Sequence, residues 1–116
     1  MNLFENFELT NIFPGIIFIL LGLFMNFFPP KKINSLYGYR TAASMKSQER
    51  WDFAQKYVAK KIIQTGILVV LLGLIIPFVS VGEHIRKIFG IATLMISILV
   101  LLLLTENALK NKFPKN

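Results

Sequence analysis

The residues best suited to chemistry in this chain are few and lie far apart. His84 is the only histidine, and Glu83 is its only acidic neighbour, so a metal site would be one or two ligands short. Ser44 and Ser47 lie in a polar segment without histidine, so neither has a partner that could act as its base. The chain has no cysteine, which excludes thiolate chemistry and disulfides. We therefore expect no catalytic residue, no metal and no cofactor, and we expect that the protein is not an enzyme.

Arg40 is the charged residue with the most specific binding potential. A guanidinium can hold a phosphate or a carboxylate through two parallel hydrogen bonds. Glu106, which follows the last apolar run, is one candidate partner for Arg40, and a lipid phosphate is another. The alternative is an ordinary contact with lipid headgroups. An Arg40→Lys substitution would separate these cases, because lysine can replace a point charge but cannot replace a forked contact.

Apolar segments dominate the rest of the chain. Hydrophobic residues make up 54% of the 116 positions and charged residues 16%, which is more apolar than a typical soluble domain. Residues 12–28, 62–79 and 88–104 contain no Asp, Glu, Lys or Arg. At 1.5 Å per residue each run is about 26 Å long as a helix, near the lower limit for crossing a bilayer. We predict a single all-α membrane domain, residues 1–116, with three transmembrane helices. A soluble helical bundle is the alternative, but none of the runs has a polar stripe at helical spacing.

The basic residues predict the orientation of these helices. Eight of the thirteen Lys and Arg residues lie in the central segment 29–61, three in the C-terminal tail and two in the connection 80–87, whereas the flank 1–11 has only Glu5 and Glu8 as charged residues. Basic residues concentrate on the cytoplasmic side of membrane proteins. We predict a multi-pass protein with its N-terminus outside and its C-terminus inside. The net charge of +7 then results from the excess of basic residues on the cytoplasmic side of a membrane. We expect the lipid bilayer, and no nucleic acid, as a direct partner.

Small residues recur seven positions apart in each apolar run. The pairs are Gly15 and Gly22, Gly66 and Gly73, and Gly90 and Ser97. Seven residues is close to two helical turns, so each pair lies on one face where another helix can approach closely. The first two helices run antiparallel, and we therefore expect Gly15 to lie near Gly73 and Gly22 near Gly66. The same faces could instead form a homo-oligomer.

The central segment is predicted to hold a loop followed by an amphipathic helix. Two prolines at positions 29–30 end the first helix, and either Ser44 or Ser47 could cap the next one. The apolar positions of that helix follow helical spacing at Trp51, Ala54, Val58 and Ile62. We predict a cytoplasmic helix that lies on the membrane surface and continues into the second apolar run. Packing of its apolar stripe against the protein's own loop is the alternative.

Residues 33–66 carry a distinctive arrangement, INSLYGYRTAASMKSQERWDFAQKYVAKKIIQTG. It contains an Asn, a Gly-Tyr-Arg-Thr turn, a Ser-Met pair and a Trp ten residues after the Thr. These positions are Asn34, Gly38, Tyr39, Arg40, Thr41, Ser44, Met45 and Trp51. The arrangement resembles the SdpI family of bacterial membrane proteins. Gly66 and the tail 106–113 are also similar, whereas Ala42 stands where proline is more common in the family.

The resemblance implies a minimal three-span member of that family in the bacterial cytoplasmic membrane. The family is named for an immunity protein that protects a cell from its own secreted peptide toxin, so it implies resistance to a toxin or bacteriocin by binding or shielding. It also implies, as an alternative, a signalling module whose cytoplasmic face sequesters a transcriptional repressor. A third hypothesis is a small scaffold subunit of a transporter, assembled through the glycine faces. The signature residues, together with Tyr37 at the membrane interface, are the expected contacts for a partner or for lipid.

Overall fold

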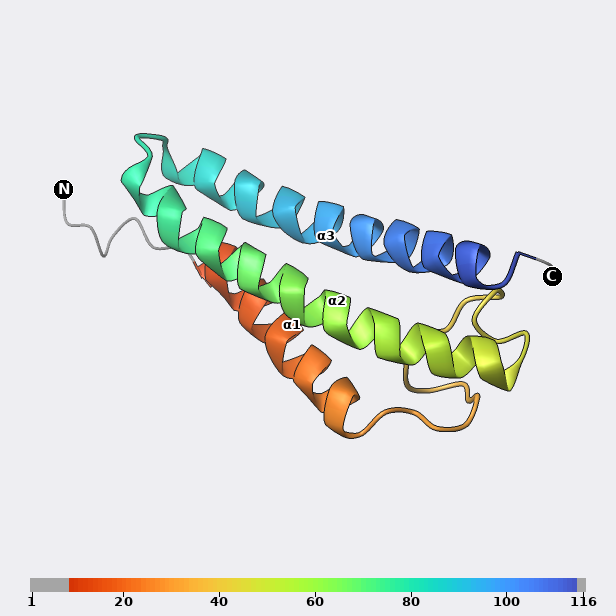
Figure 1. Ribbon diagram of the computed structural model, residues 1–116. Helices are drawn as coiled ribbons and strands as arrows, with labels where there is room; N and C mark the ends of the chain where they lie inside the picture. The colour runs from red at the N-terminus through yellow and green to blue at the C-terminus, as the bar shows by residue number, and fades with distance from the viewer. Residues whose placement is uncertain (1–8, 115–116) are drawn as a thin grey trace.

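The chain forms three long helices, and no strand occurs in the part described by the computed structural model, residues 9–114, with side chains from residue 12. The helices are α1 (Leu9–Phe27), α2 (Gln48–Ile75) and α3 (Glu83–Lys112), and a short 3-10 helix, η2 (Ile76–Phe78), follows α2. They form an elongated bundle of 56 × 25 × 20 Å, with the loop 28–47 at one end and the α2–α3 connection at the other (Figure 1). The N-terminal Glu5 and Glu8, on which part of the topology prediction depends, and Lys115 lie outside the described residues.

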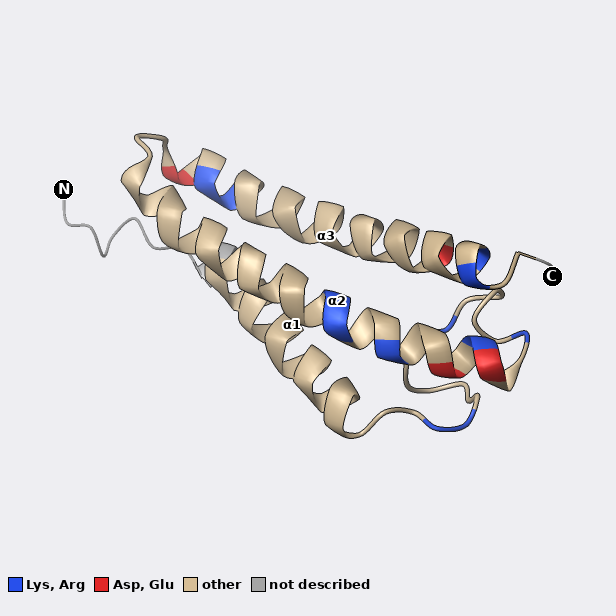
Figure 2. Ribbon diagram, in the orientation of Figure 1, with Lys and Arg blue, Asp and Glu red and all other residues tan. Residues whose placement is uncertain are grey.

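Two of the helices extend well beyond the predicted apolar runs. α2 begins at Gln48 and continues through the second apolar run, as predicted for the helix that leads into that run, whereas α3 continues to Lys112 and does not end near residue 104. α2 with η2, and α3, are each long and apolar enough to cross a membrane, and α1 adds a shorter apolar helix. Charged residues gather at the two ends of the bundle, mostly in the half nearer the loop, and leave the middle of α1 and of α3 uncharged (Figure 2). Many large apolar side chains in this middle are exposed, such as Leu20 at 62% and Met95 at 63%.

Local chemistry explains where α2 starts and stops. Ser47 is the N-cap, and its side-chain oxygen accepts a hydrogen bond from the backbone N–H of Arg50 at 3.2 Å, which satisfies one of the free donors of the first turn. Glu49 lies in that turn, where a negative charge is favourable. At the other end Pro77 lies in η2, because a proline cannot continue the hydrogen-bond pattern of an α-helix.

The apolar stripe of α2 faces the inside of the protein. Trp51 and Ala54 are fully buried, and Val58 and Ile62 belong to a core cluster with Met25 of α1. The predicted placement of this stripe on the membrane surface is therefore wrong, and the alternative, packing against the protein's own segments, is correct. Helical spacing identifies a buried stripe but does not say whether lipid or protein buries it.

Glycines allow α1 and α2 to approach closely. A Cβ atom at Gly15 would lie 2.8 Å from the carbonyl oxygen of Gly66, and one at Gly22 would lie 3.0 Å from that of Ala59. The predicted pairs, Gly15 with Gly73 and Gly22 with Gly66, are therefore wrong, because Gly15 lies opposite Gly66. The prediction aligned the ends of the apolar runs, whereas the end of α1 packs beside the part of α2 that precedes its apolar run.

The remaining small residues of the predicted packing faces are also covered within the chain. Gly73 is buried on α2, and Gly90 and Ser97 are buried on α3. α1 and α2 pack against each other more extensively than either packs against α3. The faces that the scaffold hypothesis assigned to oligomerisation are thus occupied by contacts between helices of one chain.

Candidate functional site

The loop 28–47 is anchored on the inward face of α2 by Trp51. The ring is fully buried, and its Nε1 donates a hydrogen bond to the carbonyl oxygen of Pro30 at 2.5 Å. A buried indole N–H needs such an acceptor, since leaving it unpaired would be costly. The signature tryptophan therefore fixes the start of the loop, just after α1 ends.

One helical turn further along α2, Gln55 holds the middle of the loop. Its side-chain oxygen accepts from the backbone N–H of Tyr39 at 2.7 Å, and its Nε2 donates to the carbonyl oxygen of the same residue at 2.8 Å. Gln55 is 2% exposed, so the amide exchanges both hydrogen bonds with the main chain in a buried place. The loop could not come this close with a side chain at Gly38, where a Cβ atom would lie 2.7 Å from both Gln55 Oε1 and Pro30 Cγ. Gly38 also has φ +111°, a conformation that favours glycine.

The signature Thr and Ser close a compact turn. Ser44 is fully buried, accepts from the backbone N–H of Thr41 at 2.9 Å and lies 3.0 Å from the carbonyl oxygens of both Tyr39 and Thr41. The Thr41 side chain in turn accepts from the backbone N–H of Ser44 at 3.2 Å, and the backbone N–H of Met45 donates to the Thr41 carbonyl at 3.0 Å. Ser44 therefore shapes the loop, and Ser47 is the residue that caps α2.

Glu106 of α3 joins this loop to the third helix. One of its carboxylate oxygens accepts from the Tyr39 hydroxyl at 2.6 Å and from the Thr41 hydroxyl at 2.9 Å. Burial raises the pKa of the Tyr39 phenol, and the neighbouring carboxylate raises this pKa further. The neutral phenol is thus held as a donor to a charged acceptor, an arrangement stronger than a hydrogen bond between neutral groups.

Asn34 and Arg40 organise the exposed side of the loop. The side-chain oxygen of Asn34 accepts from the backbone N–H groups of Leu36 and Tyr37 at 2.9 and 2.8 Å, the pattern of an Asx turn. The Tyr37 hydroxyl donates to the carbonyl oxygen of Phe28 at 2.7 Å, and burial raises its pKa. Arg40 is exposed and donates through Nε to the Asn34 carbonyl at 3.0 Å. The Glu106 carboxylate accepts hydrogen bonds from Tyr39 and Thr41, whereas the Arg40 guanidinium donates to the main chain of its own loop.

A buried arginine connects the loop to the C-terminal end of the chain. Arg50 is 5% exposed, and its Nη2 donates to the carbonyl oxygen of Phe113 at 3.2 Å, with Nη1 lying 3.4 Å from that of Ala43. Its guanidinium also lies 5.1 Å from the centre of the Phe113 ring, a favourable cation–π distance. The tail similarity that begins at Glu106 thus ends at Phe113, which Arg50 connects to the loop at Ala43.

The structure therefore brings most of the predicted signature residues into one hydrogen-bonded cap at the loop end. The members of this cap are Asn34, Tyr37, Gly38, Tyr39, Thr41, Ser44 and Trp51. Arg40 lies at its surface and Met45 is half-buried at the end of its turn. Sequence reasoning missed Gln55 and Arg50. A signal for Gln55 was available, because it lies four residues after Trp51 and is therefore a polar residue beside the apolar stripe.

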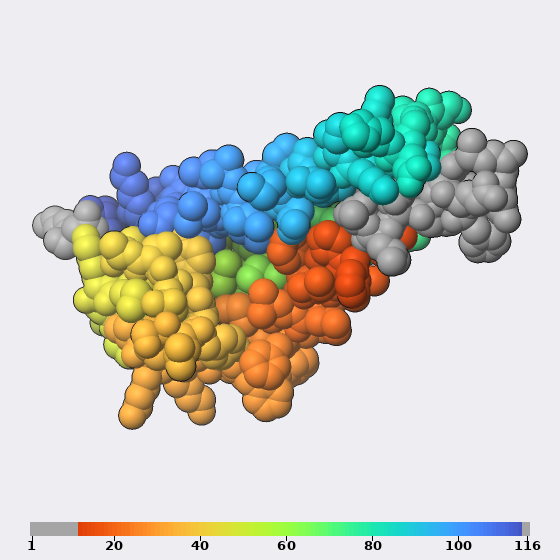
Figure 3. Space-filling view, turned by 180° about the vertical axis from the view of Figure 1, so that it is seen from behind, coloured from red at the N-terminus to blue at the C-terminus, as the bar shows by residue number. Residues whose placement is uncertain are grey.

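An apolar cavity of about 210 Å³ lies against the cap. It is lined by Leu21, Met25, Tyr37, Gly38, Tyr39, Val58 and Ile62. Three of these are cap residues, and the others come from α1 and α2. Figure 3 shows this side of the molecule, where the green surface of α2 is visible between α1 and α3 next to the yellow loop. Among the described residues, no group of three or more His, Asp or Glu side chains could hold a metal ion.

By its fold the protein is an all-helical bundle with a structured polar loop. The loop is hydrogen-bonded to one face of α2 and to Glu106 of α3. The chain belongs to the SdpI/YfhL protein family, whose pattern it matches over residues 31–105. It is also 34% identical over 102 residues to the uncharacterized protein YfhL of Bacillus subtilis (strain 168), a match that covers 88% of this chain and 87% of that protein. No solved structure matches the chain.

Proposed function

We propose that this protein resides in the bacterial cytoplasmic membrane and protects its cell from a secreted antimicrobial peptide by binding it, without catalysis. One observation carries the proposal: in a member of the SdpI/YfhL family, Gly38 and Tyr39 of the signature, together with Tyr37, line an apolar cavity. Its volume of about 210 Å³ is below the range of small-molecule pockets, roughly 300–1,000 Å³. Such a cavity suits a single apolar side chain of a membrane-active peptide.

The membrane location is supported by the surface of the helices. Large apolar side chains are exposed along all three helices, for example Ile17 at 50%, Leu68 at 58% and Ile96 at 60%. A soluble protein rarely leaves so much contiguous apolar surface in water. The charge distribution favours the loop end on the cytoplasmic side (Figure 2). Reporter fusions at residues 45 and 83 test this topology, and an external reporter at 45 would overturn it.

Survival under peptide challenge tests the protective role. A sensitive bacterium that expresses the protein should survive at least one peptide toxin from a panel that includes those encoded near such genes. Leu21→Trp fills the cavity and should abolish protection, whereas Leu20→Trp, at a position 62% exposed on the same helix, should leave it intact. Both variants must reach the membrane in equal amounts. Unchanged killing by every peptide in cells with the unaltered protein would contradict the proposal.

A second candidate is a signalling module that sequesters a soluble regulator at the cytoplasmic face. It is favoured by Leu36, which is 92% exposed at the tip of the Asx turn, close in sequence to the exposed Arg40. An exposed apolar side chain on a basic loop can anchor a partner. A soluble protein co-purified from membranes should then be lost with Leu36→Ser or Arg40→Ala and retained with Lys56→Ala. Equal recovery with all three variants would exclude this face as the docking surface.

A further inference from the structure

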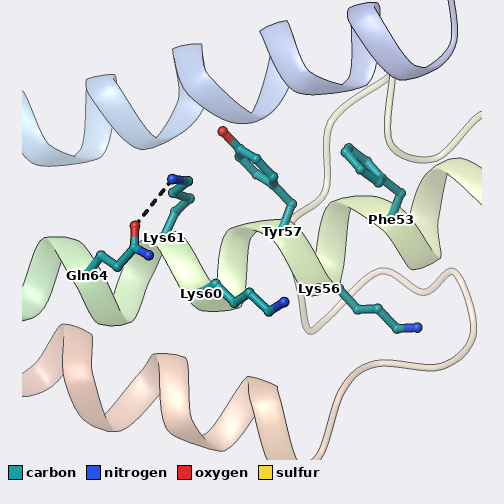
Figure 4. A pocket seen from close by; sticks show the side chains of 6 residues that line it. All are labelled: Phe53, Lys56, Tyr57, Lys60, Lys61 and Gln64. Atoms are coloured by element: carbon teal, nitrogen blue, oxygen red, sulfur yellow. Dashed lines mark hydrogen bonds between the residues drawn. The ribbon is translucent and has the colours of Figure 1, made fainter.

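The outward face of α2 carries a groove separate from the signature cap. Its volume is about 340 Å³, and it is lined by Phe53, Lys56, Tyr57, Lys60, Lys61 and Gln64. In Figure 4 the two aromatic rings and Lys61 lie on the side toward α3, and Lys56 and Lys60 extend on the side toward α1. Three of the six described residues that line the groove are lysines, and none is acidic.

Lys61 is held in place over the aromatic floor of this groove. Its Nζ lies 5.6 Å from the centre of the Tyr57 ring and 3.3 Å from Gln64 Oε1. The Tyr57 ring is stacked in turn on that of Phe53, with 5.8 Å between the centroids. An ammonium group has three donors, so after the contact with Gln64 two donors remain for an acceptor in the groove.

Lys60 and Lys61 also lie at a level where the facing parts of the neighbouring helices carry no charged side chain. Gly22 of α1 contacts α2 at Ala59 and Ile63, which bracket the two lysines. From Gly22 to the end of α1 the chain has no charged residue, and Phe24 and Phe27 are 52% and 70% exposed.

On the α3 side, Leu101 belongs to the same core cluster as Ala59 and Ile62, and its neighbours Leu99 and Leu103 are 53% and 59% exposed. Two ammonium groups beside exposed apolar side chains are costly in hydrocarbon unless they reach the interface and meet an anion there. No carboxylate in the groove supplies that anion.

We propose that Lys60 and Lys61, with Tyr57 and Gln64, form a phosphate site that takes the headgroup of an anionic phospholipid. The lysines and the Gln64 amide contact the phosphate oxygens, and the Phe53 and Tyr57 rings pack against the glycerol and the start of the acyl chains. The inference rests on the membrane location in the proposed function but does not depend on toxin binding. The signature cap and its cavity take no part in it.

Lipid binding to the purified full-length chain tests the site. The unaltered protein, Lys60→Gln/Lys61→Gln and a matched control, Lys31→Gln/Lys32→Gln, are compared in detergent by thermal shift and by native mass spectrometry. The probes are phosphatidylglycerol, phosphatidylcholine and inorganic phosphate. We expect phosphatidylglycerol to stabilise the unaltered protein and the control, and its affinity to fall about tenfold or more in Lys60→Gln/Lys61→Gln, because each interfacial lysine contributes about 1 kcal/mol to binding of anionic lipid.

The other outcomes are each decisive. An equal loss of affinity in the control would show that only bulk charge matters and would overturn the site, as would equal binding of the two lipids by the unaltered protein. Saturation by inorganic phosphate at the affinity of phosphatidylglycerol would overturn the lipid assignment in favour of a soluble phosphate ligand. If the double variant misfolds, Lys61→Arg and Lys61→Gln replace it, with retained and weakened binding expected, respectively. If carbonate washing releases the unaltered protein from membranes, the protein is not embedded in the bilayer, and the membrane location itself is wrong.

Discussion

The two faces of the first half of α2 differ in how their polar groups are satisfied. On the inward face, Trp51 and Gln55 are buried, and each is hydrogen-bonded to the main chain of the loop. On the outward face, Lys56 and Lys60 are exposed and line a groove. The difference indicates that the family signature first specifies a folded cap. The surfaces available for binding are then the cavity beside the cap and the side of α2 that the cap does not cover.

The largest contrast between the two faces should come from their aromatic residues. Trp51→Ala removes a fully buried ring and leaves the Pro30 carbonyl without its donor, and it should lower the free energy of unfolding by about 3–5 kcal/mol. Phe53→Ala on the outward face removes a half-buried ring with one stacked and one edge contact and should cost about 1.5–2.5 kcal/mol, roughly half the cost for a buried ring. Denaturant titration in detergent, followed by circular dichroism, measures both. Similar costs would remove the distinction between the faces.

A smaller effect is expected where the inward side of α2 meets α1. Gly66→Ser places a Cβ atom 2.7 Å from the carbonyl oxygen of Gly15, a backbone contact that cannot yield locally, and should cost about 1–3 kcal/mol. Gly82→Ser is the control, because no atom lies within 4 Å of a Cβ atom there and serine is a good N-cap for α3. Melting temperatures of the two variants in the same detergent provide the comparison. A stable Gly66→Ser protein would show that the helices can separate at no cost.

The latch between the cap and α3 should have an effect of about 1 kcal/mol that depends on pH. Tyr39→Phe removes the hydrogen bond to Glu106, with a cost of about 1 kcal/mol near pH 8. The pKa of Tyr39 is raised in the folded protein, so above its unfolded pKa of about 10 the folded state retains a proton that the unfolded state loses. Stability therefore falls as pH rises above about 10, and this fall should be smaller in Tyr39→Phe. Unfolding curves from pH 8 to 11 measure it, and parallel curves for both proteins would contradict the latch.

The smallest effect is expected from the exposed lysines of the outward face when no lipid is added. Lys60→Gln should change the free energy of unfolding in neutral detergent by less than about 0.5 kcal/mol, as should Lys31→Gln in the loop. Denaturant titration of the two variants side by side checks this. A large loss in Lys60→Gln alone would mean that the lysine has a structural partner, and the outward face would then resemble the inward one.

Much of the local structure was predictable from short-range pattern. The apolar runs predicted three helices, the prolines at 29–30 marked the end of the first, and Ser47 was one of two predicted caps at the start of α2. The spacing of Trp51, Ala54, Val58 and Ile62 predicted one buried face, and all four are buried. These predictions succeeded because helical period, capping and proline geometry act over a few residues and need no knowledge of the rest of the chain.

By itself, then, the sequence determined the helices, the buried stripe of α2 and the signature that places the chain in its family. Tertiary structure alone decided that loop and helices, rather than lipid, cover that stripe, and that Gly15 meets Gly66. It also decided that Glu106 accepts hydrogen bonds from Tyr39 and Thr41, which lie 67 and 65 residues away in the sequence. Each of these outcomes depends on how distant segments align along one another, and a local hydrophobic period is the same whichever apolar surface faces it.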